Sequence, residues 1–169
     1  KDVFWASGAC LFIRANAFKE LQGFDSKFFA HMEEIDLCWR AQNKGMIVTY
    51  TGMSTVYHIG AASLKFSNPK KTYLNFRNSL YTLVKNTNKP LLFVVFSRLI
   101  LDGIAGVRFL FKAKPKHMLA VIKAHGSFYR ALPYLLKFRC KHSNRKSHQQ
   151  LRSIVWAYFV LNKKNFNEL

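Results

Sequence analysis

The stretch Phe28-Phe29-Ala30-His31-Met32-Glu33-Glu34-Ile35-Asp36-Leu37-Cys38-Trp39-Arg40 holds three of the chain's eight carboxylates within four residues. Helical spacing places Met32, Ile35, Cys38 and Trp39 on one apolar stripe, with Asp36 and Arg40 four apart as an ion pair. Glu33 and Glu34 then fall in the first turn. Two interpretations stay open: acidic residues that favour the start of a helix, or a chemical site just beyond that start.

The sequence on either side of this stretch carries further motifs. Trp5-Ala6-Ser7-Gly8-Ala9 and Gly23-Phe24-Asp25 precede it, and His58-Ile59-Gly60 with Ser63 follows it. Taken together and in this order, residues 3 to 80 resemble the second half of a bacterial family 2 glycosyltransferase domain. The rhamnosyltransferase-like branch, which builds cell-envelope polysaccharides, is the most similar one.

This resemblance implies an α/β fold. Residues 1–68 would be the C-terminal, acceptor-side part of a GT-A nucleotide-sugar transferase domain, and residues 69–169 a basic, amphipathic, mainly helical region that associates with a membrane. The family's first half, with its Asp-x-Asp metal motif, has no counterpart here. We therefore expect the C-terminal portion of a longer protein, inactive by itself.

The expected elements follow from local composition. Residues 3–15 are apolar and small, which predicts a buried strand. Residues 16–21 predict a short helix with Asn16 as its cap, and Gly45 suits the end of the next helix. The β-branched and aromatic residues of 46–50 and 54–58 predict two more strands.

The implied reaction is transfer of a sugar from a nucleotide-sugar donor to a lipid-linked or cell-surface glycan, with inversion. Such a reaction needs one carboxylate to take the acceptor's proton. The resemblance assigns that role to Glu34, with Glu33 shaping the acceptor pocket. It also places Trp5, Ser7, Gly8, Asp36 and Arg40 at the substrate site, although Ser7 could simply pack in a strand and Asp36 could serve only as the partner of Arg40.

Charge on the leaving diphosphate must also be neutralised. The resemblance implies a divalent cation, Mg²⁺ or Mn²⁺, held mainly by the N-terminal half, with His58 as one ligand. Arg77, four residues after Tyr73, could contact the diphosphate. Each has a plainer alternative: His58 as an ordinary polar residue, and Arg77 as a surface side chain packed over Tyr73. Asp25 is either an N-terminal helix cap, which is the interpretation we favour, or a site residue.

Charge is distributed unevenly along the chain. Residues 1–68 carry seven Lys/Arg and six Asp/Glu, whereas residues 69–169 carry twenty and two. Residues 91–111 are apolar but contain Arg98, Asp102 and Arg108, which disfavours a spanning helix. With the basic stretch 117–138, they predict attachment to an anionic membrane at its cytoplasmic face.

A second class of function also accounts for this charge. The chain could be a non-catalytic module that binds a membrane surface or nucleic acid. Nucleic acid is disfavoured because the first half is nearly neutral and its carboxylates would repel phosphate. The three cysteines, Cys10, Cys38 and Cys140, are too few and too scattered for a disulfide framework or a zinc site, which suggests a reducing compartment.

Overall fold

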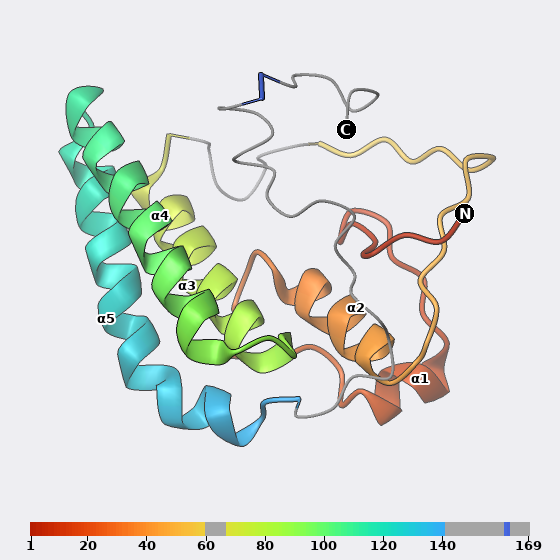
Figure 1. Ribbon diagram of the computed structural model, residues 1–169. Helices are drawn as coiled ribbons and strands as arrows, with labels where there is room; N and C mark the ends of the chain where they lie inside the picture. Colours follow the sequence, from red (N-terminus) through yellow and green to blue (C-terminus); the bar gives the residue numbers. More distant parts are fainter. Residues whose placement is uncertain (60–66, 141–160, 163–169) are drawn as a thin grey trace.

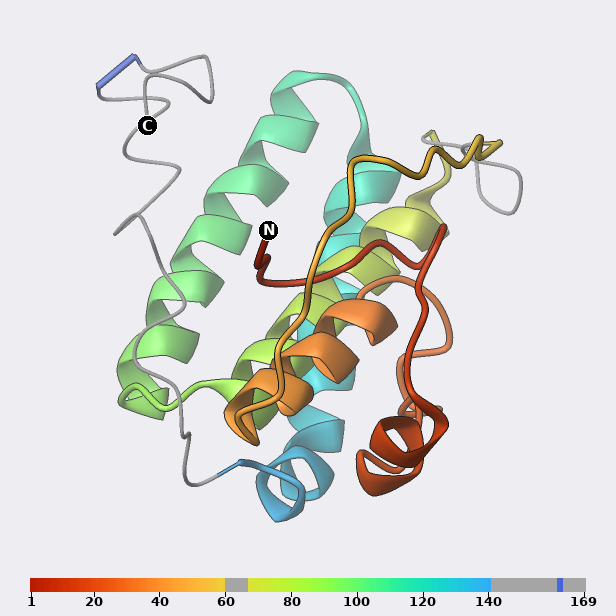
Figure 2. The same ribbon diagram turned by 90° about the vertical axis from the view of Figure 1, so that its right-hand side faces the viewer.

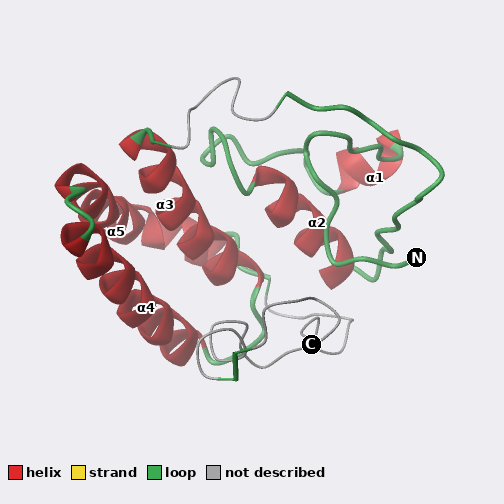
Figure 3. Ribbon diagram, turned by 90° about the horizontal axis from the view of Figure 1, so that it is seen from above, coloured by secondary structure: helices red, strands yellow, loops and turns green. Residues whose placement is uncertain are grey.

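The computed structural model describes residues 1–59, 67–140 and 161–162 (Figure 1). In this part of the chain, five helices follow one another: α1 Ala15–Glu20, α2 Glu33–Asn43, α3 Pro69–Asn86, α4 Leu91–Phe111 and α5 Pro115–Lys137. Seen from above, α3 lies in the middle, with α4 and α5 on one side and α2 and then α1 on the other (Figure 3).

The expected α/β fold is wrong. Among the described residues none forms a strand, and the β contact present is one antiparallel bridge between Asp2 and Thr49. Three backbone hydrogen bonds hold these two segments together: Val3 N–H to Val48 O, Tyr50 N–H to Lys1 O, and the Lys1 amino group to Tyr50 O. Figure 2 shows both segments on the outer side of α2.

The three expected strands do not form in the described chain, because these segments have no neighbouring strands to pair with. The carbonyls of Val3 and Phe4 accept hydrogen bonds from the Gln42 side chain of α2 rather than from a neighbouring strand. Residues 51–59 are all exposed. A β-rich composition favours an extended backbone, but a sheet forms only where several such segments pair and bury one face.

Two apolar clusters organise the helices. The larger joins α3 and α5 around Phe28, and its buried members are Phe28, Leu80, Tyr81, Val84, Phe128 and Leu135. The smaller joins α1 and α2 through Leu21, Leu37 and Ala41. Phe28 is therefore a core residue, whereas its neighbour Phe29 is 73% exposed.

Local sequence signals set several helix ends. Gly45 has φ +84° after α2, and the N–H groups of Gly45 and Met46 bond to Gln42 O and Ala41 O. This Schellman arrangement confirms Gly45 as the residue that ends the helix. The expected cap Asn16 is wrong, because α1 begins one residue earlier and Arg14 takes the capping position without a side-chain hydrogen bond.

Helix α4 occupies the residues that the sequence singled out as a long apolar stretch, Leu91 to Phe111. No helix in the described ranges combines enough length with enough unbroken apolar character to cross a bilayer.

Candidate functional site

The first turn of α2 presents Glu33 and Glu34, as the sequence predicts. The N-terminal segment runs antiparallel alongside this helix and is attached at successive turns. Gln42 donates to the carbonyls of Val3 and Phe4, and the Phe4 ring meets Trp39 edge to face with centroids 5.2 Å apart. This attachment carries the Ser7-Gly8 turn to the start of α2.

Gly8 is the residue of this segment that meets Glu34. Its backbone N–H faces the Glu34 carboxylate. A Cβ built on Gly8 would lie 3.7 Å from Cδ of Glu34, so the missing side chain leaves space directly beside the carboxyl group. The structure thus brings together two of the residues that the sequence proposed for the site.

The surroundings of Glu34 favour its protonated form. Burial raises the pKa of the Glu34 carboxyl, and the negative charge of Glu33 raises it further, while hydrogen bonds from the backbone N–H groups of Glu34 and Gly8 and the nearby His31 oppose the rise. The net direction is upward from the ordinary value of 4.5. A carboxylate with a raised pKa holds a proton more readily, which is what a general base requires.

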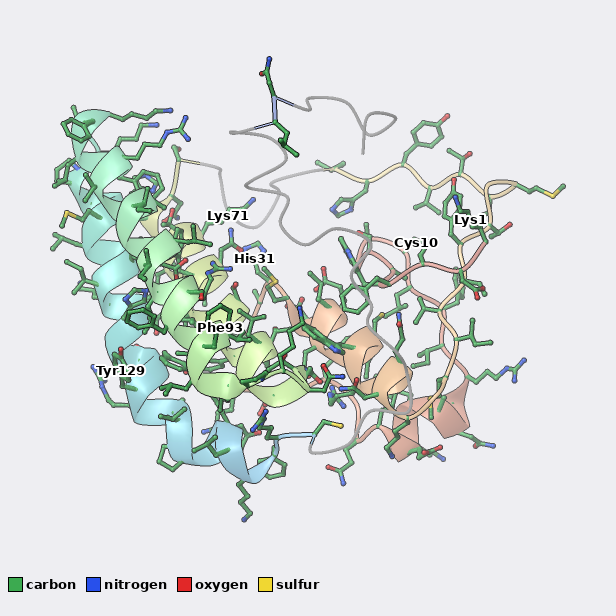
Figure 4. All side chains as sticks on the ribbon, in the orientation of Figure 1. Lys1, Cys10, His31, Lys71, Phe93 and Tyr129 are labelled. Carbon is green, nitrogen blue, oxygen red and sulfur yellow. The ribbon has the colours of Figure 1, made fainter. Side chains whose placement is uncertain are left out.

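Polar atoms without partners lie beside this carboxylate. Oε2 of Glu33 and Nε2 of His31 are buried and make no hydrogen bond within the described residues. Buried polar atoms are normally paired, so these two are available to a bound polar molecule. His31 is labelled in Figure 4, and no motif in the sequence singled it out.

The loop that delivers the chain to α2 has an unusual backbone. Phe29, His31 and Met32 have φ values of +64°, +68° and +75°, in the left-handed region that side chains rarely adopt. Such conformations persist only where the surrounding structure imposes them, and they are frequent at functional sites.

Helix α3 imposes this conformation through Arg77 and Asn78. The Asn78 amide nitrogen lies 3.0, 2.8 and 2.7 Å from the carbonyl oxygens of Phe28, Ala30 and His31. Arg77 donates to the carbonyls of Lys27 and Phe28 and to Oδ1 of Asn78, which fixes the orientation of that amide.

These contacts give Arg77 a structural position. Its guanidinium also lies 5.2 Å from the Tyr73 ring centroid and bonds to the Tyr73 hydroxyl at 3.3 Å. The packing over Tyr73 that the sequence allowed is present, and the donors of Arg77 face protein groups.

Asp36 and Arg40 form the expected ion pair, with Nε 2.8 Å from Oδ2. Asp36 is fully buried and also accepts from Lys85 and Asn86 of α3. Arg40 donates to the carbonyls of Leu21 and Gly23. Both residues therefore join α2 to its neighbours, and the structure does not bring them to the Glu34 carboxylate.

The remaining predicted residues lie at the surface. Trp5 is 42% exposed. Ser7 is exposed and its hydroxyl accepts from the N–H of Ala9 at 3.3 Å, within the turn. Asp25, by contrast, has a buried side chain that pairs with Lys85. It accepts from the N–H of Lys27 at 2.9 Å within a turn, and no helix begins there in the described chain, so the expected helix cap is wrong.

The described residues do not fit a metal ion. His58 is exposed in an extended segment, and no three His, Cys, Asp or Glu side chains converge in the part of the chain that the structure describes. Gly60 and Ser63, which belong to the same motif, lie outside the described residues.

Sequence reasoning missed Lys85, which lies 2.7 Å from Asp25 and 3.1 Å from Asp36. A signal was present: Leu74, Asn78, Tyr81 and Lys85 recur at helical spacing on one face of α3, and the first three are buried. A lysine on a buried face requires an anionic partner.

Comparison with known proteins gives partial matches. The chain is 38% identical over 63 residues to N-acetylglucosaminyl-diphospho-decaprenol L-rhamnosyltransferase of Mycobacterium tuberculosis, covering 37% of this chain and 20% of that protein. It is 24% identical over 125 residues to the low-salt glycan biosynthesis hexosyltransferase Agl10 of Haloferax volcanii, covering 72% of this chain and 41% of that protein.

The chain thus spans less than half the length of these curated relatives. No protein-family model matches it, and neither does any solved structure. At this level, the chain is similar to parts of proteins named as glycosyltransferases.

Proposed function

We propose that this chain supplies the acceptor side of a family 2 glycosyltransferase of the rhamnosyltransferase-like branch. The reaction moves a hexosyl or rhamnosyl group from a nucleotide-sugar donor to a lipid-linked or cell-surface glycan. Both named relatives transfer sugars, and the name of the mycobacterial one specifies a diphospho-decaprenol acceptor.

The observation that carries the proposal is the placement of Glu34. Its carboxyl group lies at the start of α2 against the exposed backbone of Gly8, where an added Cβ would only touch it, and burial raises its pKa. A base in this position would accept the proton of an acceptor hydroxyl as its oxygen attacks the anomeric carbon, with inversion at that carbon. Glu33 and His31, with their unpaired buried atoms, would contact the acceptor's other hydroxyls.

The divalent cation stays a prediction. It would neutralise the departing diphosphate, but the described residues offer no converging ligands for it. No step proposed for Glu34, Glu33 or His31 depends on it.

The test compares Glu34→Gln with the parent in the complete gene product, using a panel of nucleotide sugars and membranes as a source of acceptor. Turnover should fall at least about a hundredfold while donor binding is unchanged, given the usual size of general-base effects. Glu20→Gln is the matched control, because Glu20 is exposed and its carboxylate meets Lys44 at the surface. Transfer by Glu34→Gln at the parental rate would remove Glu34 from the mechanism.

A further inference from the structure

Helix α4 carries an uncharged stripe that is open to solvent along its whole length. Its members recur at intervals of three and four residues and so share one face of the helix: Leu92, Phe93, Phe96, Ile100, Gly103, Ile104, Val107, Leu110 and Phe111. Phe93 is 71% exposed, Ile104 62% and Phe111 87%. With a rise of about 1.5 Å per residue, the stripe is roughly 28 Å long.

Two of the three charges within α4 lie away from this stripe. Nε of Arg98 lies 2.6 Å from Oδ1 of Asp102, and Nε2 of His125 in α5 lies 3.2 Å from Oδ2 of the same carboxylate. Asp102 is 2% exposed. Arg98 and Asp102, two of the three charges that disfavour a spanning helix, thus lie between α4 and α5. The third, Arg108, is exposed at the edge of the stripe, four residues after Ile104 and three before Phe111.

Helix α5 extends this apolar face on the side that meets α4. Ile122 and Tyr129 lie within one turn of His125, so they share the side of α5 that meets α4, and both are more than half exposed. Lys116 and Lys123 are on the opposite side, where they line a depression of about 390 Å³ against Lys70 and Tyr73 of α3. Figure 4 labels Phe93 and Tyr129 on the two helices.

The charge of α4 and α5 favours an anionic lipid surface as the partner of the apolar face of α4. Residues 91 to 140 contain nine Lys/Arg and a single carboxylate, the buried Asp102. A second copy of the chain placed on the same face would bring like charges together across a symmetric interface. An anionic lipid surface instead offers hydrocarbon for the stripe and phosphate for the lysines.

We propose that α4 lies in the plane of an anionic bilayer, with its apolar stripe among the acyl chains and the basic residues at its C-terminal end and in the α4–α5 turn at the headgroups. Arg108 lies in the last turn of α4, Lys112 and Lys114 occupy the α4–α5 turn, and all three are exposed. This attachment does not depend on the transfer reaction, and it can be tested without enzymatic activity.

The test measures binding of the purified 169-residue chain to vesicles of equal parts phosphatidylcholine and phosphatidylglycerol, by co-sedimentation. Phe93→Asp combined with Phe96→Asp should weaken the apparent Kd at least about a hundredfold, since each change puts a charge in place of an exposed aromatic ring that the bilayer would bury. Phe12→Asp is the matched control, because Phe12 is 92% exposed and lies far from α4 in the sequence. This variant should bind the vesicles like the parent. Circular dichroism of each variant checks the fold.

A second arm tests the charge contribution. Replacement of Arg108, Lys112 and Lys114 together by Gln should weaken binding to the mixed vesicles and leave binding to pure phosphatidylcholine unchanged. High salt should reduce parental binding without abolishing it, because the apolar contribution is insensitive to ions.

Three outcomes would overturn the proposal. The parent could fail to bind the mixed vesicles, or the double Phe variant could bind them as tightly as the parent. A parent that is dimeric and becomes monomeric in the double variant, without vesicle binding by either, would assign the stripe to a second copy.

Discussion

Nζ of Lys85 lies 3.1 Å from Oδ2 of Asp36 in the protein interior, and the two side chains are 4% and 0% exposed. The same ammonium group lies 2.7 Å from Asp25. One cation from α3 thus pairs with a carboxylate of α2 and with a carboxylate of the turn after α1. These contacts join α2 and the turn after α1 to α3, the helix that also holds the loop before α2.

Replacement of Lys85 by Met should destabilise the protein strongly. Asp36 would keep Arg40 and Asn86 as partners, but Asp25 would lose its ion pair in a buried position. Breaking a buried pair from one side costs about 3–5 kcal/mol of unfolding free energy, measurable by urea denaturation.

Lys44→Met provides the control for this variant. Lys44 pairs with Glu20 at the surface, where the side chains are 48% and 57% exposed. This change should alter the unfolding free energy by less than about 1 kcal/mol. Equal effects of the two substitutions would show that the Lys85 pairs are not a principal support of the fold.

Asn78→Asp tests the clamp on the loop before α2. The substitution conserves shape but removes the amide donors and sets a carboxylate against the carbonyls of Phe28, Ala30 and His31. A loss of about 3 kcal/mol is expected, because buried acceptors lose their partners and face a negative charge. Asn75→Asp, on the same helix at a half-exposed position, should change the unfolding free energy little; a similar loss in both variants would contradict the clamp.

Glu34 should make stability and activity depend on pH in opposite directions. Its folded-state pKa is raised by burial, so the folded protein binds the proton more tightly than the unfolded chain. Stability contributed by the protonated group is therefore lost as pH rises through the raised pKa, whereas a base becomes active over the same range.

Glu34→Gln should accordingly raise Tm at neutral pH and have no such effect below the pKa of the unfolded state. Thermal unfolding at the two pH values checks this. The acid limb of the parental pH–rate profile should fall above 4.5, the ordinary value for this carboxyl. A lower Tm for Glu34→Gln at neutral pH would contradict the burial argument.

Asp25 should make stability depend on pH in the opposite direction, because its ionised form stabilises the folded protein. Burial alone would raise its pKa, but the hydrogen bonds from Lys85 and from the Lys27 backbone outweigh it, and the net shift is below the ordinary 3.8. The stability that ionised Asp25 contributes is present above its unfolded-state pKa and is lost as pH falls through its lowered folded-state pKa. Asp25→Asn should therefore destabilise the protein at neutral pH and much less in strong acid, as acid titration of Tm would show.

Gly45 and Gly103 form a matched pair of glycines. Gly45 has φ +84° at the end of α2, so Gly45→Ala should cost about 1 kcal/mol through backbone strain. Gly103 lies inside α4 with nothing within 4 Å of an added Cβ, so Gly103→Ala should stabilise the helix by about 0.5–1 kcal/mol. Denaturant midpoints that move in the same direction for both variants would contradict the two assignments.

Helices were the part of this fold that local sequence could specify. The bounds of α4, the carboxylates in the first turn of α2, the Asp36–Arg40 pair and the terminating Gly45 were all recognisable before the structure. Each depends on hydrogen bonds and side-chain contacts between residues at most five positions apart.

Tertiary structure decided what depends on distant partners. Residues 46–50 have the composition of a strand, yet in the described chain they meet one extended neighbour instead of a sheet. Lys85 pairs with Asp25, sixty residues earlier, and Asn78 bonds to His31, forty-seven residues earlier. No local sequence pattern predicts which distant residues will pair in this way. The placement of Gly8 beside Glu34 likewise follows from how the first segment packs along α2, because packing alone sets which distant backbone groups come together.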